Sequence, residues 1–264
     1  MNCIFCKHIS DNSISIEHII PESLGNKEHT LPQGIVCDRC NKYFAIKIEK
    51  PLLELPYFVS VRHRNQIENK KRRVPIEEGI ALTPFNGKVQ MHNDKKGKAI
   101  SFEDEATVEW LKQNKTFTLI VPVNDQPPSD HFAISKLLGK IAIEAIAKVG
   151  IEVEGGLDDV VHNPGLDPIR SYVRYGKGVK YWPYHYRVLY PEGHFVEDPK
   201  TNIPYEVIHE FQLFETSKNI FHLILIIFGI EYCINLCDPS ITAYQQWLSD
   251  HNNECPLYGH FNNL

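Results

Sequence analysis

The sequence predicts an α+β protein: a small N-terminal ββα module, residues 1–60, followed by a mixed α+β domain with antiparallel strands, residues 61–264. Two observations support this prediction. Four of the first forty residues are cysteines in two tight pairs, which bracket a strand-like segment and the start of a helix. After residue 130, a long apolar helical segment precedes several β-rich runs, an order that is typical of α+β domains.

The cysteines form two Cys-x-x-Cys pairs, Cys3/Cys6 and Cys37/Cys40. Each pair offers two sulfur ligands on one turn of the chain, and two such pairs suit a tetrahedral zinc ion. We therefore expect a structural zinc site. A zinc ribbon that only binds DNA or a protein could use the same cysteines, so this pattern leaves the activity open.

The residues between the pairs predict a strand, a loop, a second strand and a helix. Ser15–Ile20 alternates and is rich in β-branched residues, which is typical of a short strand. Turn-forming residues run from Pro21 to Gly34, and Ile35–Val36 is expected to form the returning strand. Asp38 is placed to begin a helix. A fold of this size buries too little apolar surface to be stable alone, so a metal is expected to hold it.

Three features of this segment match a known family: EHIIP at residues 17–21, the Leu24-Gly25 turn and VCDRCN at residues 36–41. Through them, residues 1 to about 50 resemble the HNH (ββα-metal) endonucleases, in the subgroup with a CxxC…CxxC zinc site. The resemblance implies that His18 activates water, Glu17 binds a catalytic metal and Asn41 completes the site. Family members usually have an orienting Asn at the position of Pro32, so another group or a backbone carbonyl has to hold the imidazole here.

The expected chemistry is one-metal hydrolysis of a DNA phosphodiester bond. The oxygen atoms of Glu17 and Asn41 are ligands that suit Mg²⁺ or Mn²⁺. Such an ion would polarise the phosphate and stabilise the leaving oxygen. The imidazole of His18 can be neutral near pH 7 and can accept a proton from the attacking water.

Charge is distributed unevenly along the chain. Residues 1–75 carry 12 Lys and Arg against 8 Asp and Glu, although the whole protein has a net charge of −5. Six basic residues are predicted to contact nucleic-acid phosphates: Arg62, Arg64, Lys70, Lys71, Arg72 and Arg73. A solvated loop would have the same composition, so both interpretations stay open.

The remaining chain predicts regular elements and one further segment of interest. Residues 132–149 are apolar on more than one face, as expected of a buried helix ended by Gly150. In DPIRSYVRYGKG, residues 167–178, Arg170 and Arg174 share a helical face and alternate with tyrosines. They could bind nucleic acid, or they could pair with carboxylates such as Asp167; the acidic surroundings favour the second interpretation.

The spacing of apolar residues and the positions of turn-forming residues predict further strands and helices. Strands are predicted at residues 79–82, 88–91, 116–123, 186–190, 206–215, 220–228 and 230–237, and helices at 105–113 and 242–250. The last two strands flank Gly229 and are expected to pair antiparallel.

Composition limits the class of protein. No run approaches the roughly 18 apolar residues of a membrane span, and no signal peptide is expected because Cys3 and Cys6 would fall within it. Cysteines assigned to zinc fit a reducing cytoplasm.

For residues 61–264 three roles stay open: DNA recognition, sensing of a small-molecule activator, and formation of a homo-oligomer. Bacterial nucleases that resemble this chain often act in antiphage defence, and we expect a role either in such defence or in DNA processing here. The alternative is a non-catalytic zinc-binding nucleic-acid or protein adaptor.

Overall fold

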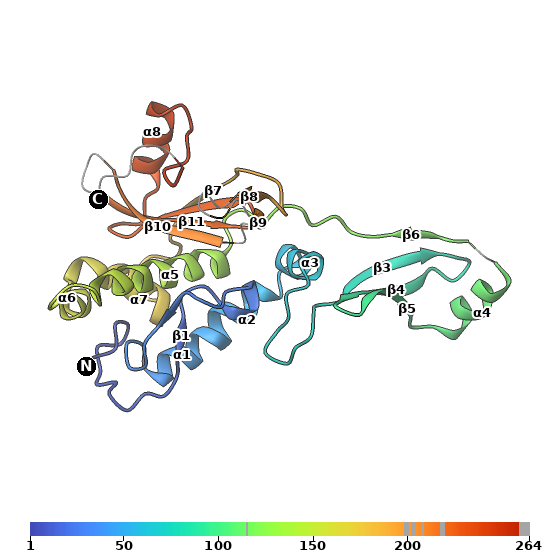
Figure 1. Cartoon of the computed structure of the whole chain (residues 1–264), viewed down its shortest axis with the longest axis horizontal. Coiled ribbons are helices and arrows are strands. Elements are labelled where there is room, and N and C mark those ends of the chain that lie inside the picture. The colour runs from blue at the N-terminus through green and yellow to red at the C-terminus, as the bar shows by residue number, and fades with distance from the viewer. Residues whose placement is uncertain (115, 198–200, 202–203, 207–208, 217–219, 259–264) are drawn as a thin grey trace. The chain divides into compact units, whose positions relative to one another are not determined.

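The computed structural model describes residues 1–114, 116–197, 201, 204–206, 209–216 and 220–258 (Figure 1). Its contacts group the chain into two compact units. Unit 1 consists of Met1–Pro21, Asn26–Leu52 and Asp130–Leu264, and unit 2 of Glu22–Gly25 and Leu53–Ser129. These units differ from the predicted division at residue 60, because the C-terminal half of the chain forms one unit with the N-terminal module.

The N-terminal part of unit 1 has the predicted ββα order. It consists of β1 (Glu17–His18), β2 (Thr30–Leu31), α1 (Asp38–Phe44), a π-helical turn (Ala45–Glu49) and α2 (Lys50–Leu53). β1 pairs antiparallel with β2, Glu17 opposite Leu31 and His18 opposite Thr30. The helix begins at Asp38, where the sequence placed its start.

The returning strand predicted at Ile35–Val36 is wrong; β2 lies five residues earlier. The Ile35 N–H donates to the Pro32 carbonyl across a turn, and Gly34 in that turn has a φ of +91°. A backbone that turns in this way cannot continue a strand. Ile35 instead accepts a hydrogen bond from the Ile4 N–H, which joins the two cysteine-bearing segments.

Three helices of unit 1 pack together after residue 130. They are α5 (Phe132–Gly150), α6 (Gly156–His162) and α7 (Asp167–Tyr175), with a 3₁₀ turn (Pro164–Leu166) before α7. The buried helix predicted at residues 132–149 is therefore confirmed. A Cβ atom at Gly139 would lie 2.7 Å from Cγ2 of Val173, so the missing side chain permits α5 and α7 to approach closely.

A four-stranded antiparallel sheet completes unit 1. Its strands are β7 (Tyr184–Val188), β10 (His209–Thr216), β11 (Ile220–Ile227) and β12 (Ile230–Asn235), in the order β10-β11-β12-β7. β11 and β12 pair antiparallel, as predicted. α5 and α8 (Thr242–Asp250) cover opposite faces of this sheet (Figure 1). A separate two-stranded ribbon is formed by β8 (Phe195–Glu197) and β9 (Pro204–Glu206).

Unit 2 contains a second antiparallel sheet, in the order β5-β4-β3-β6. Its elements are a 3₁₀ turn (Glu22–Leu24), α3 (Pro56–Arg64), β3 (Glu77–Leu82), β4 (Gly87–Asp94), β5 (Gly97–Phe102), α4 (Glu105–Gln113) and β6 (Thr118–Ile120). The sequence analysis did not predict β5, whose residues are mostly exposed. In the part of the chain that the structure describes, no helix has the length and apolarity of a membrane span. The α+β class with antiparallel sheets is confirmed.

Candidate functional site

The four cysteines of the two pairs converge at one place in unit 1. Their sulfur atoms all lie within 4.8 Å of one another, and Cys6 Sγ is 3.6 Å from Cys37 Sγ. Four sulfurs around a zinc ion at about 2.3 Å lie roughly 3.8 Å apart, so the spacing suits that ion. Among the described residues, no other group of His, Cys, Asp and Glu side chains converges in this way.

Each cysteine pair lies on a tight backbone turn. The Cys3 carbonyl accepts a hydrogen bond from the Lys7 N–H, and Lys7 takes a φ of +60°. The Cys37 carbonyl accepts from Cys40 N–H at 2.9 Å as α1 begins. Cys37 N–H also donates to Cys3 Sγ at 3.3 Å, so backbone hydrogen bonding already stabilises negative charge on one sulfur.

The sulfurs compete for negative charge. A hydrogen bond with Cys40 lowers the pKa of Cys3 to about 4, whereas burial raises the pKa of Cys6 to about 11. The same contact with Cys3 raises the pKa of Cys40 well above its ordinary value. Four thiolates can therefore coexist here only beside a cation, and a divalent ion supplies that charge. The donor set fits structural zinc.

Helix α7 contributes a direct contact to this cluster. Arg174, which is only 7% exposed, donates from Nε to Cys40 Sγ at 3.1 Å, and its guanidinium lies 4.3 Å from the ring centre of Tyr43. The neighbouring Arg170 donates from Nε to the Ile4 carbonyl at 2.6 Å and pairs with Asp167. Both arginines thus join α7 to the N-terminal module.

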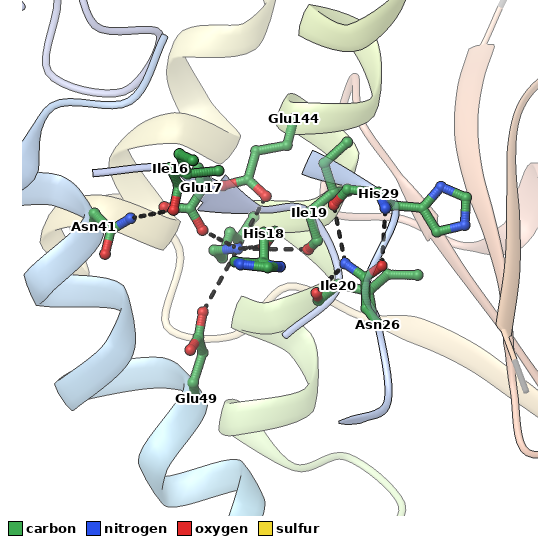
Figure 2. A network of polar contacts seen from close by, with 11 residues as sticks. Ile16, Glu17, His18, Ile19, Ile20, Asn26, His29, Asn41, Glu49 and Glu144 are labelled. Atoms are coloured by element: carbon green, nitrogen blue, oxygen red, sulfur yellow. Dashed lines mark hydrogen bonds and ion pairs between the residues drawn. The ribbon is translucent and has the colours of Figure 1, made fainter. Parts of the chain in front are cut away.

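The second polar centre lies on β1. Glu17 is buried, and its Oε1 is 2.8 Å from Nζ of Lys140, a fully buried residue of α5. Figure 2 shows the carboxylates of Glu17, Glu49 and Glu144 directed toward one point, which the ion pairs identify as the Lys140 ammonium. Oε2 of Glu17 is buried and has no hydrogen-bond partner among the described residues.

Charges in this centre influence one another strongly. Burial raises the pKa of the Glu17 carboxyl, although the adjacent Lys140 ammonium opposes that shift. Burial also raises the pKa of Glu144 well above its ordinary value. Burial alone would lower the pKa of Lys140, but the carboxylates of Glu144 and Glu17 raise it. Lys140 is therefore a permanent cation beside β1.

His18 follows Glu17 on the same strand but is only half-buried. Successive side chains of a strand leave it in opposite directions, which explains the different burial of the two residues. Nδ1 of His18 is buried without a hydrogen-bond partner in the described part of the chain. Its backbone carbonyl accepts from Lys140 Nζ at 2.9 Å.

Asn41 approaches β1 from the first turns of α1 (Figure 2). Its Nδ2 lies 3.4 Å from the carbonyl oxygen of Ile16, the residue before β1. The amide nitrogen is thereby directed to the backbone, and Oδ1 is left for another partner. The predicted trio of Glu17, His18 and Asn41 is thus drawn from one strand and the helix beside it.

Asn26, which lies in the turn-forming segment between Pro21 and Gly34, closes the loop between β1 and β2. It is fully buried, donates from Nδ2 to the carbonyls of Ile20 and His29 at 2.6 and 2.9 Å, and accepts from two backbone N–H groups at Oδ1. These four bonds hold the two strands in register behind His18.

Residues 3–54 match the family described as HNH endonuclease. Residues 3–54 are an HNH module. The match includes both cysteine pairs and the β1–α1 site, and it ends two residues into the Leu53–Ser129 segment of unit 2. The comparisons with curated proteins and with solved structures gave no match. The HNH module therefore carries the functional assignment, which is that of a nuclease family.

The predicted phosphate-binding residues belong to unit 2, outside the HNH module. Arg64, Lys70, Lys71, Arg72 and Arg73 are exposed, as contact with a phosphate requires. Arg62 is not: only 5% of its surface is exposed, because it faces inward on α3. The phosphate contact predicted for Arg62 is therefore corrected.

The hairpin between β4 and β5 brings further basic residues next to the exposed residues 70–73. The sequence analysis did not predict this neighbourhood. Gln66 Nε2 donates to Asn93 Oδ1 at 3.0 Å, and Lys95 pairs with Glu68 at 3.6 Å, so the hairpin lies beside the 65–75 loop. The hairpin adds three exposed lysines: Lys95 and Lys96 at its tip and Lys98 in β5. We name these residues, with those at 70–73, the basic loop pair.

Sequence reasoning also missed Lys140 and Glu144. Both belong to the helix that was predicted to be buried, and that prediction used only the apolar residues of the helix. A Lys and a Glu four residues apart inside an otherwise apolar helix are a usable signal, since buried charges require partners. For Arg170 and Arg174, the nucleic-acid interpretation finds no support: both are buried against the HNH module.

Proposed function

We propose that this protein is a metal-dependent endonuclease that hydrolyses DNA phosphodiester bonds through its HNH module. The observation that carries the proposal is the placement of Glu17, His18 and Asn41 on β1 and α1, beside a four-cysteine cluster that suits structural zinc. Oε2 of Glu17 is a buried acceptor without a partner among the described residues, and a carboxylate oxygen of this kind suits a divalent cation.

Each side chain has a separate role. Oε2 of Glu17 and Oδ1 of Asn41 would hold Mg²⁺ or Mn²⁺, since both are hard oxygen ligands. A bound divalent ion supplies polarisation of the phosphate and charge stabilisation at the leaving oxygen. His18 accepts the proton of the attacking water through the ring nitrogen other than its buried Nδ1. Cys3, Cys6, Cys37 and Cys40 keep the strand and helix together through zinc.

The test is a plasmid-cleavage assay with purified, zinc-loaded protein in MgCl₂ or MnCl₂. His18→Ala should lower the cleavage rate by roughly 10²–10⁴, the usual contribution of a general base, with unchanged zinc content and circular dichroism. His8→Ala is the matched control, because His8 is an exposed histidine beside the first cysteine pair. Wild-type cleavage by His18→Ala would remove the assignment.

The basic loop pair supplies a surface for the substrate. It presents seven exposed Lys and Arg residues on the 65–75 loop and the adjacent β4–β5 hairpin. In the loop, Asn69 Oδ1 accepts from the N–H groups of Lys71 and Arg73 and shapes the turn. Flexible cations at such a surface bind phosphates without reading sequence. We propose that this surface contacts the DNA backbone.

The broader role is proposed by analogy. Appended domains of HNH nucleases serve DNA recognition, ligand sensing or self-association, and defence against phage DNA or other DNA processing in the cytoplasm fits each of these. Immediate plasmid cutting by the pure protein indicates a free-standing nuclease. Cutting that begins only when a nucleotide signal is added indicates a gated effector with a small-molecule activator.

A second candidate function is a non-catalytic zinc-dependent adaptor for nucleic acid or protein. Two observations favour it: Pro32 occupies the place of the usual orienting Asn, and one oxygen of Glu17 is already paired with Lys140. An adaptor would bind DNA in a gel-shift assay in a zinc-dependent manner and would show no cleavage with either metal ion.

A further inference from the structure

Lys140 has a bonding pattern that accounts for its position inside an apolar helix. An ammonium group has three donors. Three acceptors lie within 2.9 Å of Nζ: Glu17 Oε1 at 2.8 Å, and Glu144 Oε2 and the His18 carbonyl at 2.9 Å each. Two of these acceptors belong to Glu17 and His18 of the proposed active site, and the third, on Glu144, belongs to the same helix as Lys140.

The cluster is asymmetric in charge. One ammonium faces three carboxylates, those of Glu17, Glu144 and Glu49, and the first two are fully or almost fully buried. Glu17 is bound by Lys140 through one oxygen only, and its other oxygen has no partner in the described part of the chain. The ammonium thus fixes the direction of the carboxylate while it leaves one oxygen for a second cation.

Stability alone does not account for this arrangement. A buried ion pair commonly contributes no more than apolar side chains of the same volume, because desolvation offsets the attraction. The neighbouring positions of α5 are filled by Ile141, Ala142 and Ile143, so an apolar residue would suit the helix. What Lys140 adds is a fixed orientation for the backbone and carboxylate of β1.

We propose that Lys140 is a positioning residue of the HNH site. It holds the Glu17 carboxylate so that Oε2 is presented to the catalytic cation, and it holds the His18 carbonyl so that the imidazole keeps its place on β1. It thereby takes over an orienting role that Pro32 cannot perform, and it makes α5, outside the matched residues 3–54, part of the site. This inference rests on the proposed nuclease function.

The experiment measures Mn²⁺ binding to zinc-loaded, full-length protein by electron paramagnetic resonance, beside Mn²⁺-dependent plasmid cleavage. Lys140→Met alone leaves two buried carboxylates unpaired and can prevent folding, so Lys140→Met/Glu144→Leu is made as well. In the folded variant we expect Mn²⁺ affinity to fall by about 10–100-fold, the usual cost of losing a group that orients a metal ligand. Lys148→Met, an exposed lysine on the same helix, should bind Mn²⁺ as the wild type does.

A double-mutant cycle separates positioning from a general structural role. In a Glu17→Gln background, the substitutions at 140 and 144 should lower Mn²⁺ affinity no further, because Lys140 acts through Glu17. Unchanged Mn²⁺ affinity in the folded Lys140→Met/Glu144→Leu protein, or equal losses in both backgrounds, would overturn the inference. If the wild type neither binds Mn²⁺ nor cuts DNA, the proposed function itself fails; if only the Lys140 result fails, the nuclease assignment stands.

Discussion

The contact between Arg174 and the cysteine cluster leads to a quantitative prediction for Arg174→Met. The substitution keeps much of the aliphatic stem and removes the guanidinium, which donates to Cys40 Sγ at 3.1 Å and lies over Tyr43 at 4.3 Å. A hydrogen bond from a charged donor contributes about 1.5–3 kcal/mol, and a cation–π contact about 0.5–1 kcal/mol. We expect the variant to lose about 2–4 kcal/mol of stability in the zinc-loaded state.

Two measurements check this prediction. Zinc release to a chromogenic chelator should accelerate by at least tenfold, since the sulfur charge is less well stabilised, and the urea midpoint of unfolding should fall. Arg39→Met is the control, because Arg39 is exposed on α1 between Cys37 and Cys40. If Arg174→Met protein retains zinc and unfolds as the wild type does, then α7 does not support the cluster and the energetic argument is wrong.

Three further predictions concern the rest of the chain. Gly139→Ala should destabilise unit 1 by about 1–3 kcal/mol in urea unfolding, because its Cβ would overlap Val173; unaltered stability would mean that α5 and α7 separate easily. Burial lowers the pKa of His222 from 6.5 to about 4, so the neutral ring stabilises the fold fully above pH 6.5, and this contribution, roughly 3 kcal/mol at most, is lost as the pH falls toward 4. In a series of unfolding midpoints measured against pH, His222→Leu should therefore lose less stability on acidification than the wild type. An equally steep loss in the variant would contradict this prediction. Replacing residues 70–73 of the basic loop pair by Gln should weaken DNA binding similarly for all sequences and reduce its dependence on salt, and a sequence-selective loss would point to base contacts instead.

Local sequence was sufficient for some of the architecture. The α5 helix was predicted to within a residue because its apolar positions and Gly150 are local signals. The β2 strand was misplaced because its register depends on Asn26 hydrogen bonds and on the turn at Gly34, neither of which alters the pattern of apolar residues. Arg62 was predicted to be exposed because charge alone does not tell which face of α3 is buried.

The sequence by itself determined the chemistry of the N-terminal module. It contains two cysteine pairs, an adjacent acid and imidazole, and an amide at the start of a helix. These residues are contiguous or closely spaced, so the local chain geometry is enough to indicate which side chains share a site. Tertiary structure decided what surrounds them. Lys140 and Arg174 reach the module from more than one hundred residues away, 122 from His18 in the first case and 134 from Cys40 in the second. No local pattern encodes such contacts, because a buried charge finds its partner only when distant segments fold against each other.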